Sequence, residues 1–329
     1  MNASDAPLSP APGVALVTGA TGFVGSHLAR RLIADGFEVH ALCRPTSDFR
    51  RLADVANRVG RIVAPLEDAA LVSRAVSAIR PDYVFHLASS TVVAGATASA
   101  AELVSANFLG TVHLLDACDA VACRAVVTTG DSFEYTPTHD ALVESAACHP
   151  GTLHGITKLA ATLYAQAKGA EHGRPVVTLR MFSTYGPGDH PRRLVPRVIA
   201  GALAGTPLAL SRPGIVRDWV YVDDVVDLYL EAAARAPDLA GRVFNAGSGR
   251  GTELGTIVAT VLSLAGSRAA AQWGVFAAPA HDAHPWVADS RLTFATFAWR
   301  PRVPLHDGLR RTLDAMRARD ASAETGPTP

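Results

Sequence analysis

The sequence predicts an α/β protein: a Rossmann-like, doubly wound parallel sheet with a smaller C-terminal α/β lobe. Three observations predict this fold. Between Val14 and about Arg180, apolar runs alternate with helical patterns, which is typical of a parallel sheet covered by helices on both faces. A glycine-rich turn at Gly19–Gly25 follows the first apolar run and opens a helix. After Gly186 the elements are short and rich in proline and arginine, so they are expected to cap the sheet.

The strands of the first half are predicted from short apolar runs, and the helices from apolar residues at helical spacing. The predicted strands are Val14–Thr18, Glu38–Arg44, Arg61–Ala64, Tyr83–Leu87, Ala125–Thr129 and Val176–Leu179. The predicted helices between them are His27–Ala34, Ala69–Ile79, Glu102–Cys118 and Ile156–Ala170. In the second half we expect a strand running into a helix over Trp219–Ala234, a strand at Arg242–Asn245, and helices at Gly251–Leu264 and Leu305–Arg317.

This order predicts two domains between two loose tails. Residues 1–12 and 320–329 are the tails, 13–180 the dinucleotide-binding domain, and 181–319 a substrate-binding lobe. Within the lobe, the segments at about 215–248 are expected to return to the first domain.

Composition excludes several classes of protein. The 329 residues carry 30 Lys and Arg against 30 Asp and Glu, a balance that disfavours nucleic acid or an anionic membrane as the main partner. No apolar run approaches the ~20 residues of a membrane span, and Met1–Pro12 lacks the basic start of a signal peptide. Four cysteines without paired spacing indicate reduced thiols in a cytoplasmic protein, and no metal site is expected: Cys43, Cys118, Cys123 and Cys148.

The glycine turn has the chemistry of an anion site. Its glycines let backbone N–H groups approach a pyrophosphate, and the following helix N-terminus adds partial positive charge. The spacing is G-x-x-G-x-x-G, wider than G-x-G-x-x-G. The alternative is an ordinary strand-to-helix turn.

Several further motifs follow in order along the chain. They are G-A-T-G-F-V-G at Gly19–Gly25, H-L-A at His86–Ala88, N-F-L-G-T at Asn107–Thr111, R-M-F-S-T-Y-G-P-G at Arg180–Gly188, R-D-W-V-Y-V-D-D at Arg217–Asp224, F-N-A-G-S-G at Phe244–Gly249 and W-R-P-R at Trp299–Arg302. Together they resemble the extended short-chain dehydrogenase/reductase family, in particular its nucleotide-sugar branch. The resemblance runs from Val14 to about Thr312.

That resemblance implies a catalytic Tyr four residues before a Lys. Tyr164 and Lys168 match this pattern literally, but Tyr164 lies only 16 residues before Arg180. The spacing in relatives, about 26 residues, leads to His154, with Lys158 four residues further on the same helix face. We therefore expect His154 in place of the family's Tyr.

The role of His154 has three interpretations. As imidazolium it donates or relays the proton that a ketone oxygen needs during reduction. As neutral imidazole it orients the carbonyl through its N–H group. In the third, the site is not catalytic. The resemblance implies that Lys158 holds the nicotinamide ribose.

The third catalytic position is a hydroxyl after the strand that ends near Thr129. Ser132 is the first choice and Thr129 the second. Asp131 is an acid or base, as in dehydratase relatives, or a cap of the local backbone. The Asp–Glu pair of dehydratases is missing, because Ser132 follows Asp131.

The cofactor is expected to be NADP(H), with NAD less favoured. Relatives that use NAD carry an Asp at the end of the second strand, whereas this strand ends in Arg44, which suits a 2′-phosphate. The alternative is a surface arginine. The resemblance implies further cofactor contacts from Gly19, Thr21, Gly22, Phe23, Val24, Gly25, Leu66, Leu87, Ala88, Asn107, Lys158 and Phe182.

The substrate is expected to be a nucleotide sugar. Arg217 matches the arginine that contacts the diphosphate in relatives, and Arg192 adds positive charge. Ser183 replaces a usual Asn, and Tyr135 is expected to line the pocket. The resemblance also implies a homodimer.

These features predict an NADPH-dependent ketoreductase acting on a nucleotide-activated keto sugar of the 4-keto-6-deoxyhexose type. Three alternatives remain open. They are an epimerase that retains its cofactor, a reductase of a polyketide-type ketone, and a catalytically silent dinucleotide-binding protein.

Overall fold

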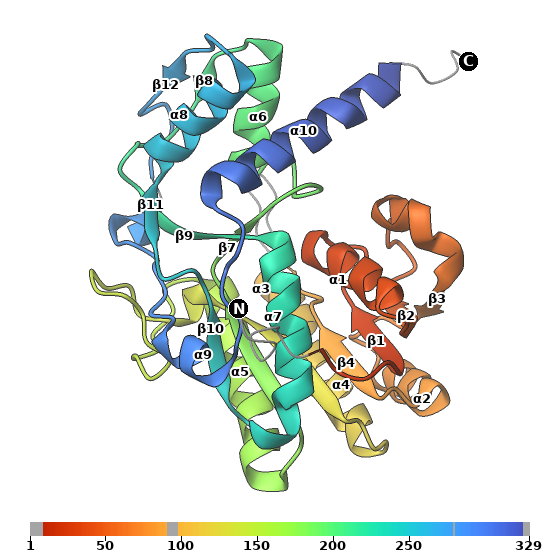
Figure 1. The fold of residues 1–329 in the computed structure, drawn as a ribbon. Coiled ribbons are helices and arrows are strands. Elements are labelled where there is room, and N and C mark those ends of the chain that lie inside the picture. Colours follow the sequence, from red (N-terminus) through yellow and green to blue (C-terminus); the bar gives the residue numbers. More distant parts are fainter. Residues whose placement is uncertain (1–8, 91–97, 279, 325–329) are drawn as a thin grey trace.

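The computed structural model describes residues 9–90, 98–278 and 280–324 (Figure 1). Seven parallel strands form the central sheet, in the order β10-β6-β5-β4-β1-β2-β3. They are β1 Val14–Thr18, β2 Glu38–Cys43, β3 Val59–Val63, β4 Tyr83–His86, β5 Ala125–Asp131, β6 Val176–Met181 and β10 Val243–Ala246. The strand order reverses between β1 and β4, and the crevice at the carboxyl ends of these two strands is where such sheets bind ligands.

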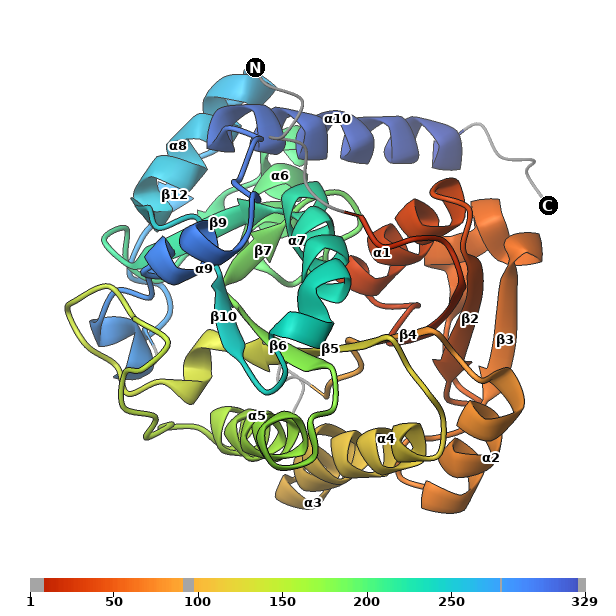
Figure 2. The same cartoon turned by 60° about the horizontal axis from the view of Figure 1, so that its bottom comes forward.

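Helices cover both faces of the sheet (Figure 2). One face carries α1 (Phe23–Ala34) and α7 (Val222–Arg235), and the other carries α2 (Ala69–Ile79), α4 (Gly110–Asp119) and α5 (Leu153–His172). Each face has its own apolar core. Val17 of β1 belongs to the core under α1 and α7, whereas Leu16 belongs to the core under α2 and α4, because successive strand residues point to opposite faces.

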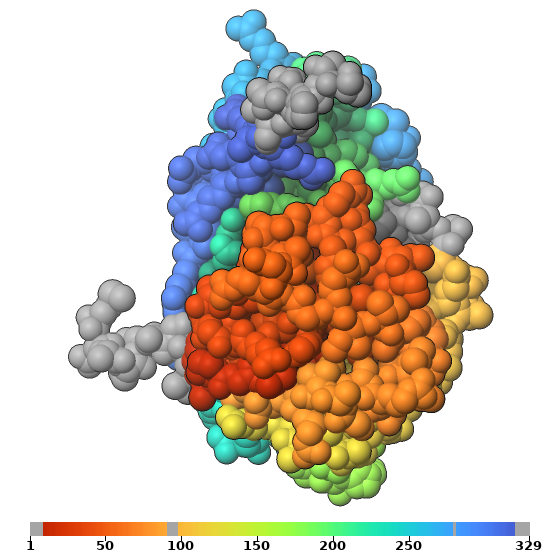
Figure 3. Space-filling view, turned by 90° about the vertical axis from the view of Figure 1, so that its right-hand side faces the viewer, coloured from red at the N-terminus to blue at the C-terminus, as the bar shows by residue number. Residues whose placement is uncertain are grey.

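A smaller lobe lies above the parallel sheet in Figure 1. It holds the sheet β11 (Gly251–Glu253), β9 (Val216–Tyr221) and β7 (Ser183–Tyr185), the pair β12 (Ala271–Gln272) and β8 (Leu208–Ala209), and the helices α6 (Leu194–Ala204), α8 (Leu254–Ala265) and α10 (Leu305–Glu324). Val198, Ile257 and Leu309, one from each helix, meet in its core. In Figure 3 the blue C-terminal segment lies above the red and orange N-terminal segments.

Shorter elements complete the chain. They are α3 (Ala100–Leu103), α9 (Arg291–Thr296), the 3₁₀ helices η1 (Phe49–Arg58), η3 (Ser132–Glu134), η4 (Ala236–Asp238) and η5 (Ala280–Ala283), and the π-helix η2 (Val104–Leu109). Within the described ranges, no helix is long and apolar enough to cross a membrane, and no cluster of three or more potential metal ligands occurs. The four cysteines are free thiols.

The structure corrects several of the sequence-based boundaries. The segment predicted as a helix from Gly251 begins with the strand β11, and α8 starts only at Leu254. The single helix predicted over Glu102–Cys118 is α3, η2 and α4 in succession, with a capping box between Ser99 and Glu102 at its start. The sequence analysis did not predict α6, which tolerates Pro196 because the proline lies in the first helical turn. The helix predicted over Leu305–Arg317 continues to Glu324 as α10.

Candidate functional site

The turn between β1 and α1 is shaped by close backbone contacts. Gly19 has φ +71°, and a Cβ there would lie 2.6 Å from the backbone nitrogen of Ala88. A Cβ on Gly25 would lie 2.2 Å from the carbonyl oxygen of Gly19. The helix is capped by Gly22, which has no side chain to satisfy the first N–H groups. These groups are therefore available to an anion.

A groove with about 380 Å³ of water-sized space runs from this turn along the carboxyl ends of β1, β2 and β4. Its apolar part is lined by Leu42, Ala64 and Leu66, and its polar rim by Arg44, Ser47 and Glu67. Thr21, Gly22, Leu87 and Ala88 also line it, as the sequence analysis expected.

Arg44 sits on a fixed turn at the rim of the groove. Its backbone N–H donates to the Ser47 hydroxyl at 3.0 Å, and its carbonyl accepts the Ser47 N–H at 3.0 Å. The side chain is exposed, and among the described residues its guanidinium has no ion-pair or hydrogen-bond partner. The first carboxylate after the strand, Asp48, caps η1 and pairs with Arg50 at 2.7 Å. Arg44 is therefore a free cation on the groove.

Asn107 supports the groove from behind. Its amide accepts the Ser90 N–H at 2.7 Å and donates to the Ser90 carbonyl at 3.0 Å and the Thr157 hydroxyl at 3.0 Å. His86 is equally internal, between the hydroxyls of Thr18 and Thr111. Burial lowers the pKa of His86 to about 3, so this imidazole is neutral.

His154 and Asp131 meet where β5 ends. Thr152 caps α5 by accepting the Gly155 N–H, which places His154 in the first turn. Nε2 of His154 lies 3.3 Å from Oδ2 of Asp131, whereas Nδ1 is buried with no partner among the described residues. Burial opposes the Asp131 charge, but the hydrogen bond and charge of His154 hold the pKa of Asp131 below its ordinary value. Asp131 is thus a carboxylate directed at an imidazole.

Lys158 lies one turn further along α5 and is 5% exposed. Its ammonium donates to the Thr129 carbonyl. Burial lowers the pKa of Lys158, and the carboxylates of Glu134 and Asp131 oppose that shift. One helix and the end of one strand therefore bring together an imidazole, a carboxylate and a buried amine.

The two candidate hydroxyls differ in their surroundings. Thr129 uses its hydroxyl within the fold, because it donates to the His86 carbonyl at 2.7 Å and lies 2.6 Å from the Tyr229 hydroxyl. A hydrogen bond from Thr129 to a substrate oxygen would therefore have to replace one of these internal contacts. Ser132 begins η3, immediately after Asp131, and is 8% exposed. Of the two, Ser132 is the one next to the His154–Asp131 pair.

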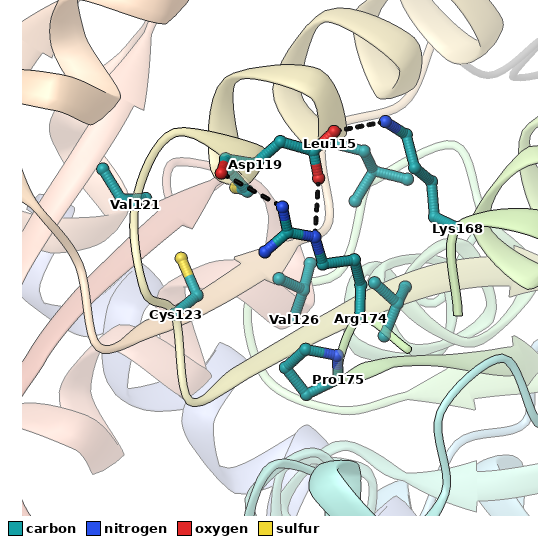
Figure 4. A pocket seen from close by; sticks show the side chains of 10 residues that line it. Leu115, Asp119, Val121, Cys123, Val126, Lys168, Arg174 and Pro175 are labelled. Carbon is teal, nitrogen blue, oxygen red and sulfur yellow. Dashed lines mark hydrogen bonds and ion pairs between the residues drawn. The ribbon is translucent and has the colours of Figure 1, made fainter. Parts of the chain in front are cut away.

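Tyr164 and Lys168 face α4. The Tyr164 hydroxyl donates to Asp116, and the Lys168 ammonium lies 2.7 Å from Asp116 and 2.5 Å from Asp119. Figure 4 shows Lys168 and Arg174 converging on Asp119 around a small cavity. These contacts place the literal Tyr–Lys match in the packing of α4 against α5.

Arg217 faces the same region from β9. Its guanidinium is paired with Asp282 of η5 and lies 5.5 Å from the ring centre of Phe133 and 5.8 Å from that of Trp286. Burial lowers the pKa of Arg217, while the carboxylates of Asp282 and Asp131 oppose this. Arg217 is thus a half-buried cation between aromatic rings, with an internal counter-ion.

Comparison with known proteins identifies the family. The family model described as "NAD dependent epimerase/dehydratase family" matches residues 15–247. The chain belongs to this family. It is 32% identical over 325 residues to a dTDP-glucose 4,6-dehydratase of Streptomyces griseus, covering 91% of this chain and 92% of that protein.

Two further proteins are similar to this chain. A trifunctional UDP-glucose 4,6-dehydratase, UDP-4-keto-6-deoxy-D-glucose 3,5-epimerase and UDP-4-keto-L-rhamnose reductase of Arabidopsis thaliana is 27% identical, with 91% of this chain covered but only 46% of that protein. The crystal structure of Thermus thermophilus UDP-glucose 4-epimerase in complex with NAD is 27% identical with a TM-score of 0.81, covering 92% of this chain and 99% of that one.

The side chains of several residues expected at the ligand site make contacts within the protein. Tyr135 was expected to line the substrate pocket, but it is fully buried and its hydroxyl donates to Asn245 at 2.7 Å. Phe182 packs in the same core, and Phe23 and Val24 pack against the core of the second lobe. Ser183 is half-buried in β7, and Arg192, which is exposed, donates its backbone N–H to His190.

One site residue escaped the sequence analysis. Glu134 is fully buried beside Asp131 and pairs with Arg180 at 2.7 Å. Buried carboxylates are rare unless paired, and the partner lies on the next strand, so the local sequence gave no signal for it.

Proposed function

We propose that this protein is an NADPH-dependent ketoreductase that acts on a nucleotide-activated keto sugar of the 4-keto-6-deoxyhexose type. Arg44 carries the NADPH preference. It is an exposed cation on the rim of the dinucleotide groove, without an ion-pair partner in the part of the chain that the structure describes, and no residue of its turn from Arg44 to Ser47 is acidic. A guanidinium there favours a 2′-phosphate through charge-assisted hydrogen bonds.

The groove fits a dinucleotide. Gly19 and Gly25 leave no room for side chains, so an anion can approach the N-terminus of α1. Leu42, Ala64 and Leu66 offer an apolar slot for a base, and Arg44 stands at its edge. The nicotinamide, when bound, supplies hydride to the substrate carbon. The chain itself supplies binding, orientation and the proton.

His154 is the proposed proton donor. A ketone oxygen gains negative charge as hydride reaches its carbon, and an imidazolium within hydrogen-bond reach protonates it. The Asp131 carboxylate, 3.3 Å from Nε2, orients the ring. Ser132, next along the chain, is the proposed donor that polarises the ketone, and Lys158 is the proposed partner of the ribose.

The diphosphate of the substrate is proposed to bind near Arg217, with Arg192 at the lobe surface. Arg217 lies at the site but already has a carboxylate partner in Asp282. A diphosphate therefore has to share this arginine with Asp282, and this competition weakens binding of substrates without further contacts.

The test is a product assay. Purified protein is given NADPH or NADH and a panel of dTDP- and UDP-linked 4-keto-6-deoxy sugars, and loss of reduced cofactor is measured together with the product. The proposal expects stoichiometric NADPH oxidation with a deoxysugar product. Absence of turnover across the panel, with NADPH bound, would favour a silent binding protein.

Epimerisation with a retained cofactor is a second candidate. The relatives include epimerases, and Arg51 connects Thr21, which lines the groove, to Gly188 by donating to both carbonyls, at 3.4 Å and 2.9 Å. Such a bridge slows cofactor release. This candidate expects cofactor that co-purifies with the protein and interconverted sugars with no net NADPH consumption.

We further propose a homodimer formed through α5 and η2. Three large side chains of α5 and two of η2 are between 40% and 55% exposed: Leu153, Ile156, Leu163, Val104 and Leu109. Two copies would bury these apolar side chains against each other. Leu163→Glu should convert a dimer into a monomer in sedimentation analysis. Val63→Glu, at an equally exposed position on β3, should leave the state unchanged.

A further inference from the structure

Glu134 is a fully buried carboxylate beside the candidate catalytic residues. It accepts three hydrogen bonds from three different elements. Oε1 accepts the Asp131 N–H at 2.8 Å and the Thr162 hydroxyl at 2.9 Å, and Oε2 accepts Nε of Arg180 at 2.7 Å. A carboxylate satisfied in this way is fixed in position.

Asp131 is held by hydrogen bonds to the Glu134 side chain and to the Phe133 backbone. Its N–H donates to Glu134, and its Oδ1 accepts the Phe133 N–H at 2.9 Å, which together form a capping box around η3. The other carboxylate oxygen, Oδ2, is left to face His154 at 3.3 Å. The orientation of Asp131 towards the imidazole therefore depends on the anchor that Glu134 provides.

Glu134 also acts on Lys158. Thr162 lies four residues after Lys158 on α5 and donates to Glu134 at 2.9 Å, which places the Glu134 carboxylate on the helix face that carries Lys158. The charges that act on this buried amine are those of the Glu134 and Asp131 carboxylates, and the neutral imidazole of His86 also lies near it. Glu134 gives the largest of the charge effects that keep the amine protonated against burial, and Asp131 follows. Arg180 neutralises part of the Glu134 charge through their ion pair.

We propose that Glu134 is a positioning residue of this site: it anchors Asp131 so that the Asp131 carboxylate faces His154, and it sets a buried negative charge opposite Lys158. The catalytic part of this inference rests on the proposed function, in which His154 and Lys158 contact substrate and cofactor. Removal of the Glu134 charge therefore lowers the pKa of Lys158 further.

The sequence offers a direct test, because the chain contains only two lysines, Lys158 and Lys168. In protein labelled with ¹³C-lysine, the two side chains give two sets of signals, assigned with Lys158→Met. We expect the Lys158 midpoint to fall by about one pH unit in Glu134→Gln, the change typical of losing one close opposite charge. Lys168, which contacts Asp116 and Asp119, serves as an internal reference and should not move.

The matched control is Glu231→Gln, the same substitution at a carboxylate that is 1% exposed and accepts the Ala298 N–H. It should leave the Lys158 midpoint at the wild-type value. If Glu134→Gln fails to fold because Arg180 loses its partner, Glu134→Gln with Arg180→Gln removes both charges. A smaller fall of the Lys158 midpoint is then expected, because Arg180 offsets part of the Glu134 charge in the wild type. A Lys158 midpoint that stays at the wild-type value in the folded variant would overturn the proposal.

The pH dependence of activity is a second measurement, and a purely structural role of Glu134 would leave it unchanged. Glu134→Gln should shift the alkaline limb of the kcat profile to lower pH, with KM changed less than kcat. Because the lysine titration needs no substrate, it still reports on Glu134 if no ketone is reduced. A failure of the proposed function and a failure of this inference are therefore separate outcomes.

Discussion

Replacing Arg44 by Ala should weaken NADPH binding far more than NADH binding. The two cofactors differ by one phosphate, and Arg44 is the unpaired cation on the groove rim. No internal contact of the guanidinium among the described residues has to break before it binds that phosphate. Its loss therefore removes a contact made only with NADPH.

The size of the effect follows from exposure. A hydrogen bond to a charged group contributes about 1.5–3 kcal/mol, and an exposed pair lies at or below the lower end because solvent screens it. Since Arg44 is exposed, we expect about tenfold weaker NADPH binding and a change of less than about threefold for NADH.

The assay is calorimetric titration of both cofactors at low and physiological salt. The matched control is Arg50→Ala, because Arg50 lies on the same segment but is paired with Asp48 at 2.7 Å and does not line the groove. It should leave the ratio of NADPH to NADH affinity unchanged. Equal losses for both cofactors in Arg44→Ala would refute the assignment of Arg44 to the 2′-phosphate.

Three other perturbations test the site and the fold. His154→Phe should lower kcat by ~10²–10⁴ if His154 is the proton donor, with NADPH affinity retained in a binding titration; an unchanged rate would move the proton source elsewhere. Lys168→Ala should leave turnover within about twofold of wild type, because its ammonium contacts Asp116 and Asp119 on α4; an inactive variant would restore Tyr164 as the donor. Burial raises the pKa of Asp189 from 3.8 to about 6, so its contribution to stability is present at low pH and is lost as pH rises through about 6. Asp189→Asn, which stays neutral, should therefore gain in Tm relative to wild type between about pH 4 and 7, and parallel Tm curves would contradict this.

The parallel sheet could be predicted from sequence because its signals are local. The predicted β1 and α2 agree with the structure to the residue, since Val14–Thr18 is an uninterrupted β-prone run and α2 has Asp68 as a side-chain cap. The second lobe was harder. β7 has three residues and β8 two, and such strands exist only through pairing with distant partners.

The site divides in the same way. The glycine turn of the groove could be predicted from the spacing of its glycines. The helix face with His154 and Lys158 could be predicted from their four-residue spacing. Tyr135 was misplaced because its hydroxyl partner, Asn245, is 110 residues away. Nothing in the sequence around Glu134 indicated its role, because its charge partner Arg180 lies on the neighbouring strand β6. Buried polar networks are closed by tertiary contacts, and a motif does not contain them.

The use of lysine or arginine at each positively charged position of this chain is relevant to the chemistry of the site. The sequence has 28 arginines and two lysines, so arginine is the default wherever a positive charge is needed. Arginine stays charged in proteins and binds carboxylates as a fixed fork, as Arg180 binds Glu134 at 2.7 Å. Lys158 occupies a position that is 5% exposed, where burial lowers its pKa. A compact amine whose charge responds to its surroundings suits a position beside the proposed proton donor His154 and the carboxylate that orients it. A permanently charged guanidinium there would repel an imidazolium at every pH. The lysine at this buried position therefore supports the proposed proton donation by His154 over a purely structural ion cluster.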